Sequence, residues 1–359
     1  MNRRNLLSFL FIAATLGLMI VLVFSNNELG SAWDALLTLD ARWTLVAFLC
    51  IVVNVLFDTL SLHYFLRKQK YPVSLGAACH ASLTGFYYSN ITPGASGGQP
   101  MQVYSLSKQA VPVAIGTSAI SIKFFAQQMM MVLVTSVLWF CNRGFVDTQL
   151  AAAKWAIYIG YALNFASIPL ILLVALHRPL VQLIITFIIR LLAKLRLVKH
   201  PQERIIRISA GLDVYHASIL RLGKDPGQLL WMLLLAAIST LGLMSVPVAV
   251  YFALRNSGAP LGELLTASYL LFVTASYTPL PGASGAQEGG FLVFFRGVFV
   301  PGTMGLAILV WRFFTFYLFL IIGAAMSIVS SIRGNMRGRR AATAAPPQEE
   351  TAPGDPGTA

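Results

Sequence analysis

Long apolar runs separated by short polar segments dominate the chain. Six of these runs carry few charges and approach the roughly 20 residues that a helix needs to cross a bilayer. They cover residues 6–24, 43–66, 113–140, 155–176, 229–254 and 304–332. The first resembles a signal peptide, but Ser25, Asn26 and Asn27 offer no small-x-small cleavage site, so we expect a retained span. The pattern predicts an all-α polytopic membrane protein with about six full spans.

Two further apolar regions are interrupted by the same five residues, P-G-A-S-G. The copies occupy residues 93–97 and 281–285, after apolar runs over 75–88 and 261–277. Gly and Pro interrupt helical hydrogen bonding, and each backbone group freed in hydrocarbon costs several kcal/mol unless protein or a water-filled cavity satisfies it. Paired elements of this kind are typical of the binding sites of inverted-repeat transporters. We predict two re-entrant elements whose loops line one shared cavity, rather than two unrelated tight turns.

Composition supports a membrane location and excludes an ordinary soluble domain. Hydrophobic residues make up 57% of the chain and charged residues only 11%. The net charge of +13 does not indicate nucleic-acid binding, because the basic residues are separated by spans and concentrate where cytoplasmic loops are expected. Cys50, Cys79 and Cys141 lie in or beside apolar runs without metal-ligand spacing, so we interpret them as small core residues.

Lys and Arg positions predict the orientation, because cytoplasmic segments carry the excess of basic residues. If each broken element enters and leaves on one side, the basic residues expected outside are few: Arg42, Arg143, Lys154, Arg255 and Arg296. If each broken element instead crossed the membrane once, the basic stretch 178–224 would lie outside, against the expected excess of basic residues on the cytoplasmic side. We therefore predict two inverted halves, the first broken element dipping from the cytoplasm and the second from outside. Both termini are then expected on the cytoplasmic side.

We expect the chain to divide into a transmembrane domain over 1–332 and a tail over 333–359. Within the domain we expect a first half over 1–176, a linker over 177–227 and a second half over 228–332. The linker repeats apolar residues at helical spacing among Arg and Lys, which predicts amphipathic helices in the headgroup layer or covering the bundle, with a partner surface as the alternative. The tail is rich in Ala, Pro, Thr and Gly, so we predict that it is disordered and dispensable.

Charges at membrane depth are rare and are functional candidates by default. Asp58, Lys123 and Arg312 lie in predicted spans, and Glu288 lies just after the second loop. A half-helix follows each loop, over 99–108 and 288–298, and its N-terminal N–H groups suit an anion, whereas a carboxylate suits a cation. A zwitterionic or phosphorylated headgroup would satisfy both. The alternative is that Asp58 with Lys123, and Glu288 with Arg312, are neutralising pairs that hold the bundle together.

Weaker candidates lie near the same elements. Gln99 and Gln287 are polar residues beside the loops, and Arg296 is expected two turns after Glu288 on the same half-helix. His63 and His80 are interpreted as polar residues near an interface rather than as proton carriers.

Several enzymatic sites are excluded by their spacing. No Cys, His or Asp cluster has metal-ligand spacing. The Ser of P-G-A-S-G is not in a G-x-S-x-G elbow, and the glycine-rich loops lack the Lys and Ser/Thr of a P-loop. We predict no catalytic residues, no metal and no cofactor.

The two motifs, S-N-I-T-P-G-A-S-G-G-Q-P and T-P-L-P-G-A-S-G-A-Q-E-G, resemble the flippase-like family named for the transmembrane region of lysylphosphatidylglycerol synthase. That region is the membrane half of bacterial multiple peptide resistance factors. The resemblance covers about residues 5–332 and implies a bundle of two inverted halves that handles a lipid headgroup near its loops. The positions that match the motifs are Thr92, Pro93, Gly94, Gly97, Gly98, Pro100, Pro279, Pro281, Gly282, Gly285, Glu288 and Gly289.

Residues and resemblance together predict a protein that translocates or handles a polar lipid between leaflets, either an aminoacylated phospholipid or a lipid-linked glycan. The predicted substrate-binding residues are Thr92, Pro93, Gly94, Gly97, Gly98, Pro281, Gly282, Gly285, Glu288, Arg312, Asp58 and Lys123. One alternative is a phosphatidylglycerol lysyltransferase, although the soluble transferase domain of the full-length factors has no counterpart in this sequence. Another is a membrane scaffold that recruits a soluble synthase through the basic helices. The expected partners are the bilayer, a lipid headgroup, and a soluble synthase or a second copy of the chain, with no nucleic acid.

Overall fold

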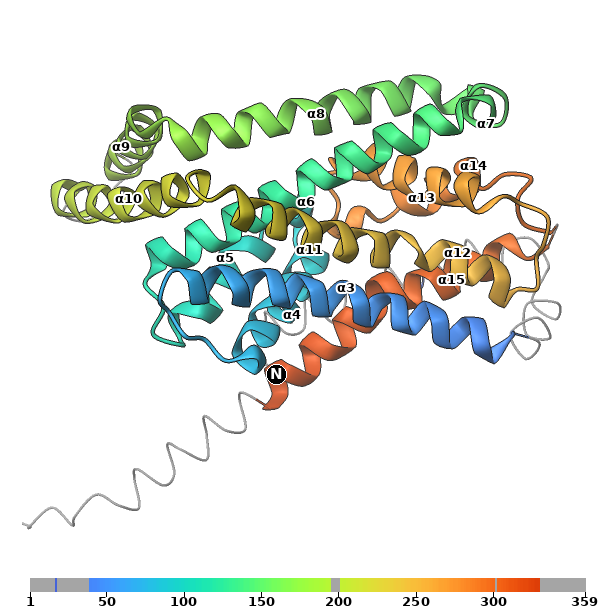
Figure 1. Cartoon of the computed structure of the whole chain (residues 1–359), viewed down its shortest axis with the longest axis horizontal. Coiled ribbons are helices and arrows are strands. Elements are labelled where there is room, and N and C mark those ends of the chain that lie inside the picture. Colours follow the sequence, from blue (N-terminus) through green and yellow to red (C-terminus); the bar gives the residue numbers. More distant parts are fainter. Residues whose placement is uncertain (1–16, 18–38, 195–200, 301, 330–359) are drawn as a thin grey trace, which may run out of the picture.

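The computed structural model describes residues 17, 39–194, 201–300 and 302–329, and this part of the chain contains helices but no strand (Figure 1). Five helical segments are long and apolar enough to cross a membrane: Ala41–Lys68, Val113–Cys141, Ala151–Leu176, Pro226–Ala253 and Met304–Val329. They confirm five of the six predicted spans and the all-α polytopic class. The predicted first span and the predicted disordered tail lie outside the described residues, except for Gly17.

Caps and breaks explain where these spans begin and bend. α3 (Ala41–Lys68) starts after Asp40, whose Oδ1 accepts from the backbone N–H of Arg42 at 2.9 Å. The span Pro226–Ala253 is divided at Ser245 into α11 (Pro226–Met244) and α12 (Val246–Ala253). Pro247 sits in the first turn of α12, where its missing N–H is not needed.

The last span contains an irregular turn. α15 (Met304–Arg312) passes directly into a π-helical turn over Phe313–Tyr317, and the helix continues to Val329. Single π-turns within α-helices are frequent at functional sites. This one begins immediately after Arg312, one of the charged residues predicted at membrane depth.

The first broken element consists of α4 (Leu75–Ile91), a 3₁₀ turn over Pro93–Ala95 and α5 (Gly98–Ser107). It lies between α3 and α6 (Val113–Cys141) at the end of the bundle where α9 projects (Figure 1). Both its entry and its exit are at that end, as the sequence predicts for a re-entrant element.

The second broken element consists of α13 (Leu261–Ala275), a 3₁₀ turn over Pro281–Ala283 and α14 (Ala286–Phe294). It lies at the opposite end of the bundle, on the side of α7 (Arg143–Thr148) (Figure 1). The two 3₁₀ turns contact each other inside the bundle. The opposed entry of the two elements agrees with two inverted halves; which end faces the cytoplasm stays a prediction.

The predicted linker forms two helices, α9 (Arg178–Lys194) and α10 (Pro201–Gly223). α10 packs against α6, and its Tyr215 is buried. This burial raises the pKa of the Tyr215 hydroxyl above its ordinary value, while a hydrogen bond to Ser121 acts in the opposite direction. α10 therefore covers the bundle, which is one of the two placements that the amphipathic pattern allows.

α9 is much less covered. It continues from α8 (Lys154–Leu176), packs against α10, and is joined to it by an ion pair of 2.6 Å between Arg178 and Asp213. An apolar face of α9 remains exposed, with the side chains of Leu183, Ile184, Phe187, Ile188 and Leu191. Such a face is typical of a helix that lies in a membrane interface.

Buried apolar side chains of the described residues form two main cores. The larger core joins α12, α13, α14 and α15, with Phe291 stacked on Phe295 at 4.4 Å and 4.9 Å from Trp311. The smaller core joins α3, α4, α5, α6 and α11 around Phe65 and Leu106.

The three cysteines are not equally buried. Cys50 and Cys79 are half-buried, but Cys141 is exposed at the end of α6, so its prediction as a core residue is wrong.

Candidate functional site

The two P-G-A-S-G loops begin with the same backbone conformation. Gly94 has φ 58° and ψ 28°, and Gly282 has φ 58° and ψ 17°. The next residues, Ala95 and Ala283, also have positive φ, at 54° and 50°. Two successive left-handed residues turn the chain sharply, which glycine tolerates and alanine does not favour. The repeated motif therefore specifies a repeated local structure.

The copies diverge after the serine, where ψ is −24° at Ser96 and 142° at Ser284. Different side chains consequently close the two loops. The N–H of Gly97 donates to Oγ1 of Thr92 at 2.9 Å, whereas the N–H of Gly285 donates to Oε2 of Glu288 at 2.6 Å. One N–H at the start of each half-helix is thus already bonded to a protein side chain and is not available to an anionic ligand.

Close approach of α4 and α5 depends on Gly98. A Cβ at this position would lie 1.9 Å from Oγ of Ser89 and 2.9 Å from the carbonyl oxygen of Gly85. Gly98 is therefore a packing residue that lets the half-helix rest on the helix before it. The sequence signal for this role was the additional glycine after P-G-A-S-G.

Both loops line one cavity of about 610 Å³, as the sequence predicts. Ligand pockets commonly have volumes of about 300–1,000 Å³. Gly94, Ala95 and Ser96 line it from the first loop, and Gly282 and Ala283 from the second. Among the described lining residues, the polar amides are Asn54, Asn90, Gln99, Gln128, Asn164 and Gln287, and the single charged residue is Arg312.

Arg312 connects the second loop to the last span. Its Nε donates to Oε1 of Glu288 at 2.5 Å, and its Nη2 donates to the carbonyl oxygen of Gly282 at 3.1 Å. The guanidinium also lies 5.2 Å from the ring of Trp311 and 5.3 Å from that of Phe316. The side chains of Arg312 and Glu288 are only 4% and 13% exposed, so this is an almost fully buried ion pair.

Glu288 does not line the cavity, although it is the most specific acidic residue of the motif. One of its oxygens accepts from Arg312 and the other from the N–H of Gly285. The cavity lining includes Arg312 but not Glu288. The electrostatic feature offered to a ligand is therefore the guanidinium, held in place by a carboxylate behind it.

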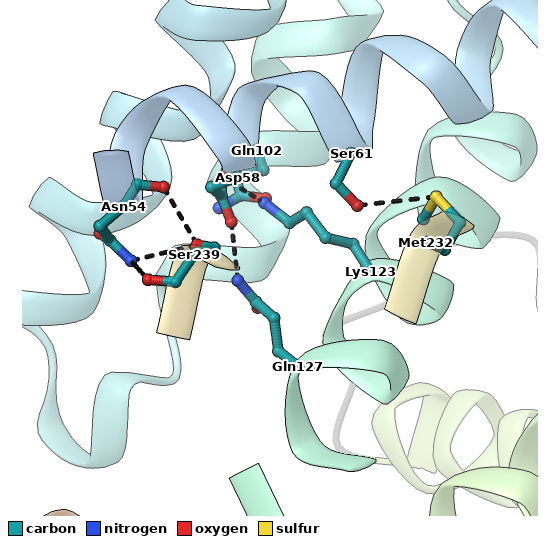
Figure 2. Close-up of polar contacts among 8 residues, drawn as sticks. All are labelled: Asn54, Asp58, Ser61, Gln102, Lys123, Gln127, Met232 and Ser239. Carbon is teal, nitrogen blue, oxygen red and sulfur yellow. Dashed lines mark hydrogen bonds and ion pairs between the residues drawn. The ribbon is translucent and has the colours of Figure 1, made fainter. Parts of the chain in front are cut away.

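Asp58 and Lys123 form a second buried cluster (Figure 2). Nζ of Lys123 donates to Oδ2 of Asp58 at 2.9 Å and to Oε1 of Gln102 at 3.0 Å, while Nε2 of Gln127 donates to Oδ1 of Asp58 at 2.9 Å. These contacts join α3, α5 and α6. Neither member of the ion pair lines the loop cavity, and their side chains are 2% and 4% exposed.

The two clusters follow a common plan. In each half, a cation on the span after the half-helix reaches back to that half-helix: Lys123 to Gln102, and Arg312 to Glu288. The carboxylate differs, because Pro100 occupies the motif position of Glu288 and the first half takes its acid, Asp58, from α3. Both ion pairs that the sequence offered as an alternative are formed.

Four of the amides in the cavity wall, Asn54, Asn90, Gln128 and Asn164, were not singled out from the sequence. Nε2 of Gln128 donates to Oδ1 of Asn164 at 2.8 Å, and Nδ2 of Asn164 donates to the carbonyl oxygen of Val273 at 3.0 Å. The available signal was an uncharged amide inside an apolar span, which is weaker than a charge but also calls for a partner.

The other predicted residues have different placements. Gln99 and Gln287 line the cavity, while Arg296 is exposed beyond Phe294, where α14 ends, so its prediction on the same helix as Glu288 is wrong. Nδ1 of His80 lies 3.1 Å from Oγ of Ser105. Six further predicted residues shape the loops without lining the cavity: Thr92, Pro93, Gly97, Gly98, Pro281 and Gly285. A role for them in substrate binding stays a prediction.

The described residues contain no group of three or more His, Cys, Asp or Glu side chains that could hold a metal.

Comparison with known proteins gives one match. The family model described as the lysylphosphatidylglycerol synthase TM region matches residues 5–323. No curated protein and no solved structure matches the chain.

Proposed function

The chain belongs to the lysylphosphatidylglycerol synthase transmembrane-region family, and from this premise we propose that it binds a lipid headgroup between its two loops and moves that lipid between leaflets. The family and the five membrane-spanning segments show a membrane protein linked to lipid handling. Movement between leaflets is the step that we add.

The observation that carries the proposal is the meeting of the two broken elements at one cavity. α4–α5 and α13–α14 enter from opposite ends of the bundle, and their 3₁₀ turns contact each other (Figure 1). A group bound between the turns contacts both broken elements, and each element leads to a different end of the bundle. Inverted-repeat transporters place substrates at such a junction, where rocking of one repeat against the other changes the side of access.

The lining favours a headgroup that carries an anionic or strongly polar group. Arg312 provides a positive charge, and the amides of Gln99, Gln128 and Gln287 provide further donors and acceptors. The apolar walls, with Phe86, Phe272 and Phe319 among them, suit the less polar part of a lipid. An aminoacylated phospholipid and a lipid-linked glycan both fit this description.

Reconstitution tests the proposal directly. The purified full chain is placed in vesicles that contain lysyl-phosphatidylglycerol, and an impermeant amine reagent measures how fast this lipid reaches the outer leaflet. We expect faster transfer than in vesicles without protein, loss of the gain in Glu288→Gln, and no loss in Asp147→Asn. Asp147 forms an exposed ion pair with Lys154 and is the matched control.

Transfer that is unchanged by Glu288→Gln would overturn the assignment of this cavity. The absence of transfer both in these vesicles and in vesicles that contain a lipid-linked glycan would overturn the function. Capture of a soluble synthase that depends on α9 and α10 but not on Glu288 would instead support a scaffold. Our proposal also includes a bacterial inner-membrane location, which rests on the resemblance to bacterial resistance factors, and cytoplasmic termini, which rest on the Lys and Arg distribution.

A further inference from the structure

A second groove lies on the bundle between α3 and α11, and it shares no lining residue with the loop cavity. Its volume is about 460 Å³. The lining residues are Leu60, His63, Tyr64, Arg67, Lys68, Trp231 and Leu235. The function proposed above uses none of them.

The groove changes from apolar to cationic along α3. Tyr64 forms an aromatic wall with Trp231, their ring centroids 6.5 Å apart, while Arg67 and Lys68 lie in the last turn of the helix. Nζ of Lys68 lies 5.7 Å from the centre of the Tyr64 ring. Tyr and Trp prefer the membrane–water interface, and basic residues at a helix end extend toward the headgroups. This order of groups matches the order along an amphiphile from acyl chain to headgroup.

The two cations are available to a ligand. Arg67 and Lys68 are both exposed, and neither forms an ion pair with a carboxylate of the described residues. Lys123 and Arg312, by contrast, are buried and paired. A positive charge that is not paired with a carboxylate beside an apolar groove can attract an anionic group without first breaking an ion pair.

Side-chain contacts join α3 and α11, the two helices that form the walls of the groove (Figure 2). Oγ of Ser61 donates to Sδ of Met232 at 3.6 Å, and Nδ2 of Asn54 donates to Oγ of Ser239 at 3.1 Å. Both contacts join α3 to α11. The groove is therefore formed before a ligand arrives, which lowers the ordering cost of binding.

We propose that this groove binds an anionic phospholipid, with the phosphate against Arg67 and Lys68 and an acyl chain along Tyr64 and Trp231. A free phosphate would leave the aromatic wall uncovered. A zwitterionic lipid would bring its own cation toward the two basic side chains. The site holds a resident lipid at the rim of the bundle, and its existence does not depend on whether the loop cavity transports lipid.

Native mass spectrometry of the full chain in neutral detergent tests this proposal, with phosphatidylglycerol and phosphatidylcholine as probes. Because each basic residue near a charged membrane surface contributes about 1 kcal/mol, we expect Arg67→Gln with Lys68→Gln to weaken phosphatidylglycerol binding at one site about tenfold or more. The exchanged double variant, Arg67→Lys with Lys68→Arg, retains both charges and should bind as the native chain does. Arg143→Gln, an exposed cation on α7, is the control for a general loss of charge.

Spin-labelled phosphatidylglycerol locates the bound lipid, because the spin label quenches the fluorescence of tryptophans near it. The part of this quenching that is absent in Trp231→Phe comes from Trp231 and therefore from lipid in the groove. We expect that part to be lost in the double Gln variant and kept in Arg312→Gln. Equal binding of phosphatidylcholine, an equal loss in Arg143→Gln, or quenching that is unaffected by Trp231→Phe would each overturn the proposal.

Discussion

Gly94 and Gly282 have the same φ of 58° in loops that belong to different halves of the chain. Each is followed by an alanine that is also left-handed, and the two turns touch inside the bundle. The identical motif thus builds two copies of one strained turn and brings them to the same cavity. Their surroundings differ, because Phe316 packs on Gly282 while the space beside Gly94 is open.

The buried ion pair of the second half should be required for lipid transfer. Glu288→Gln leaves an oxygen for only one of the two donors, Arg312 and the N–H of Gly285. We expect the variant to insert into the membrane but to lose transfer, and its stability to fall by up to about 3–5 kcal/mol, the cost of removing one partner of a buried pair. Vesicle transfer and thermal unfolding measure the two effects.

The double variant Glu288→Gln with Arg312→Gln separates function from neutralisation. If Arg312 offers its charge to the headgroup, removing both charges does not restore transfer. Recovery of transfer in this double variant would show that the pair serves only to neutralise itself, and the headgroup site should then be sought around Asp58 and Lys123.

The buried pair of the first half should behave as a structural unit. Asp58→Asn or Lys123→Met alone leaves one buried charge unpaired, and we expect each to lower the stability by about 3–5 kcal/mol. Asp58→Leu combined with Lys123→Met should recover part of this loss. Recovery stays incomplete because Gln102 and Gln127 lose their partners, at about 1–3 kcal/mol for each unsatisfied group.

Thermal unfolding in detergent checks this prediction, with Asp147→Asn as the exposed control. Breaking that surface ion pair should change the stability by less than about 1 kcal/mol. A single variant of Asp58 or Lys123 that is as stable as the control would contradict the structural role of the pair.

The packing of α5 on α4 should not tolerate a methyl group at Gly98. Gly98→Ala brings a Cβ into the Gly85 carbonyl and the Ser89 hydroxyl, so we expect a loss of about 1–3 kcal/mol from overpacking. Gly116→Ala is the matched control, because the added Cβ finds its nearest neighbour at 3.5 Å and alanine favours the helix. Equal unfolding midpoints for the two variants would show that the close approach is not required.

Opposite ends of the bundle should face opposite sides of the membrane. In a variant without Cys50, Cys79 and the exposed Cys141, single cysteines at Gln109 and Ser257 should react with an impermeant maleimide from opposite sides. Ser257 is preferred to the neighbouring Asn256, which is buried and accepts a hydrogen bond from the N–H of Val300. Reaction of both cysteines from the same side would remove the inverted arrangement.

The sequence alone determined the parts that depend on local chemistry. Hydrocarbon imposes a minimum length on each apolar run, so five spans were found near their observed limits. Gly and Pro interrupt a helix wherever they occur together, so both loops were found with the short helices beside them. Repetition of the motif then predicted that the loops share a cavity, because neither could be left unsatisfied in lipid.

Only the tertiary structure decided how distant side chains are oriented. The sequence offered Asp58 with Lys123 and Glu288 with Arg312 as one of two alternatives. It gave no sign that Gln102 joins the first pair or that Glu288 does not line the cavity. Arg296 was misplaced because α14 ends at Phe294. These outcomes depend on the rotation and depth of helices that are far apart in the chain. The packing of one helix face against another fixes the rotation and the depth of each helix. The periodicity of apolar residues within a single helix does not predict either of them.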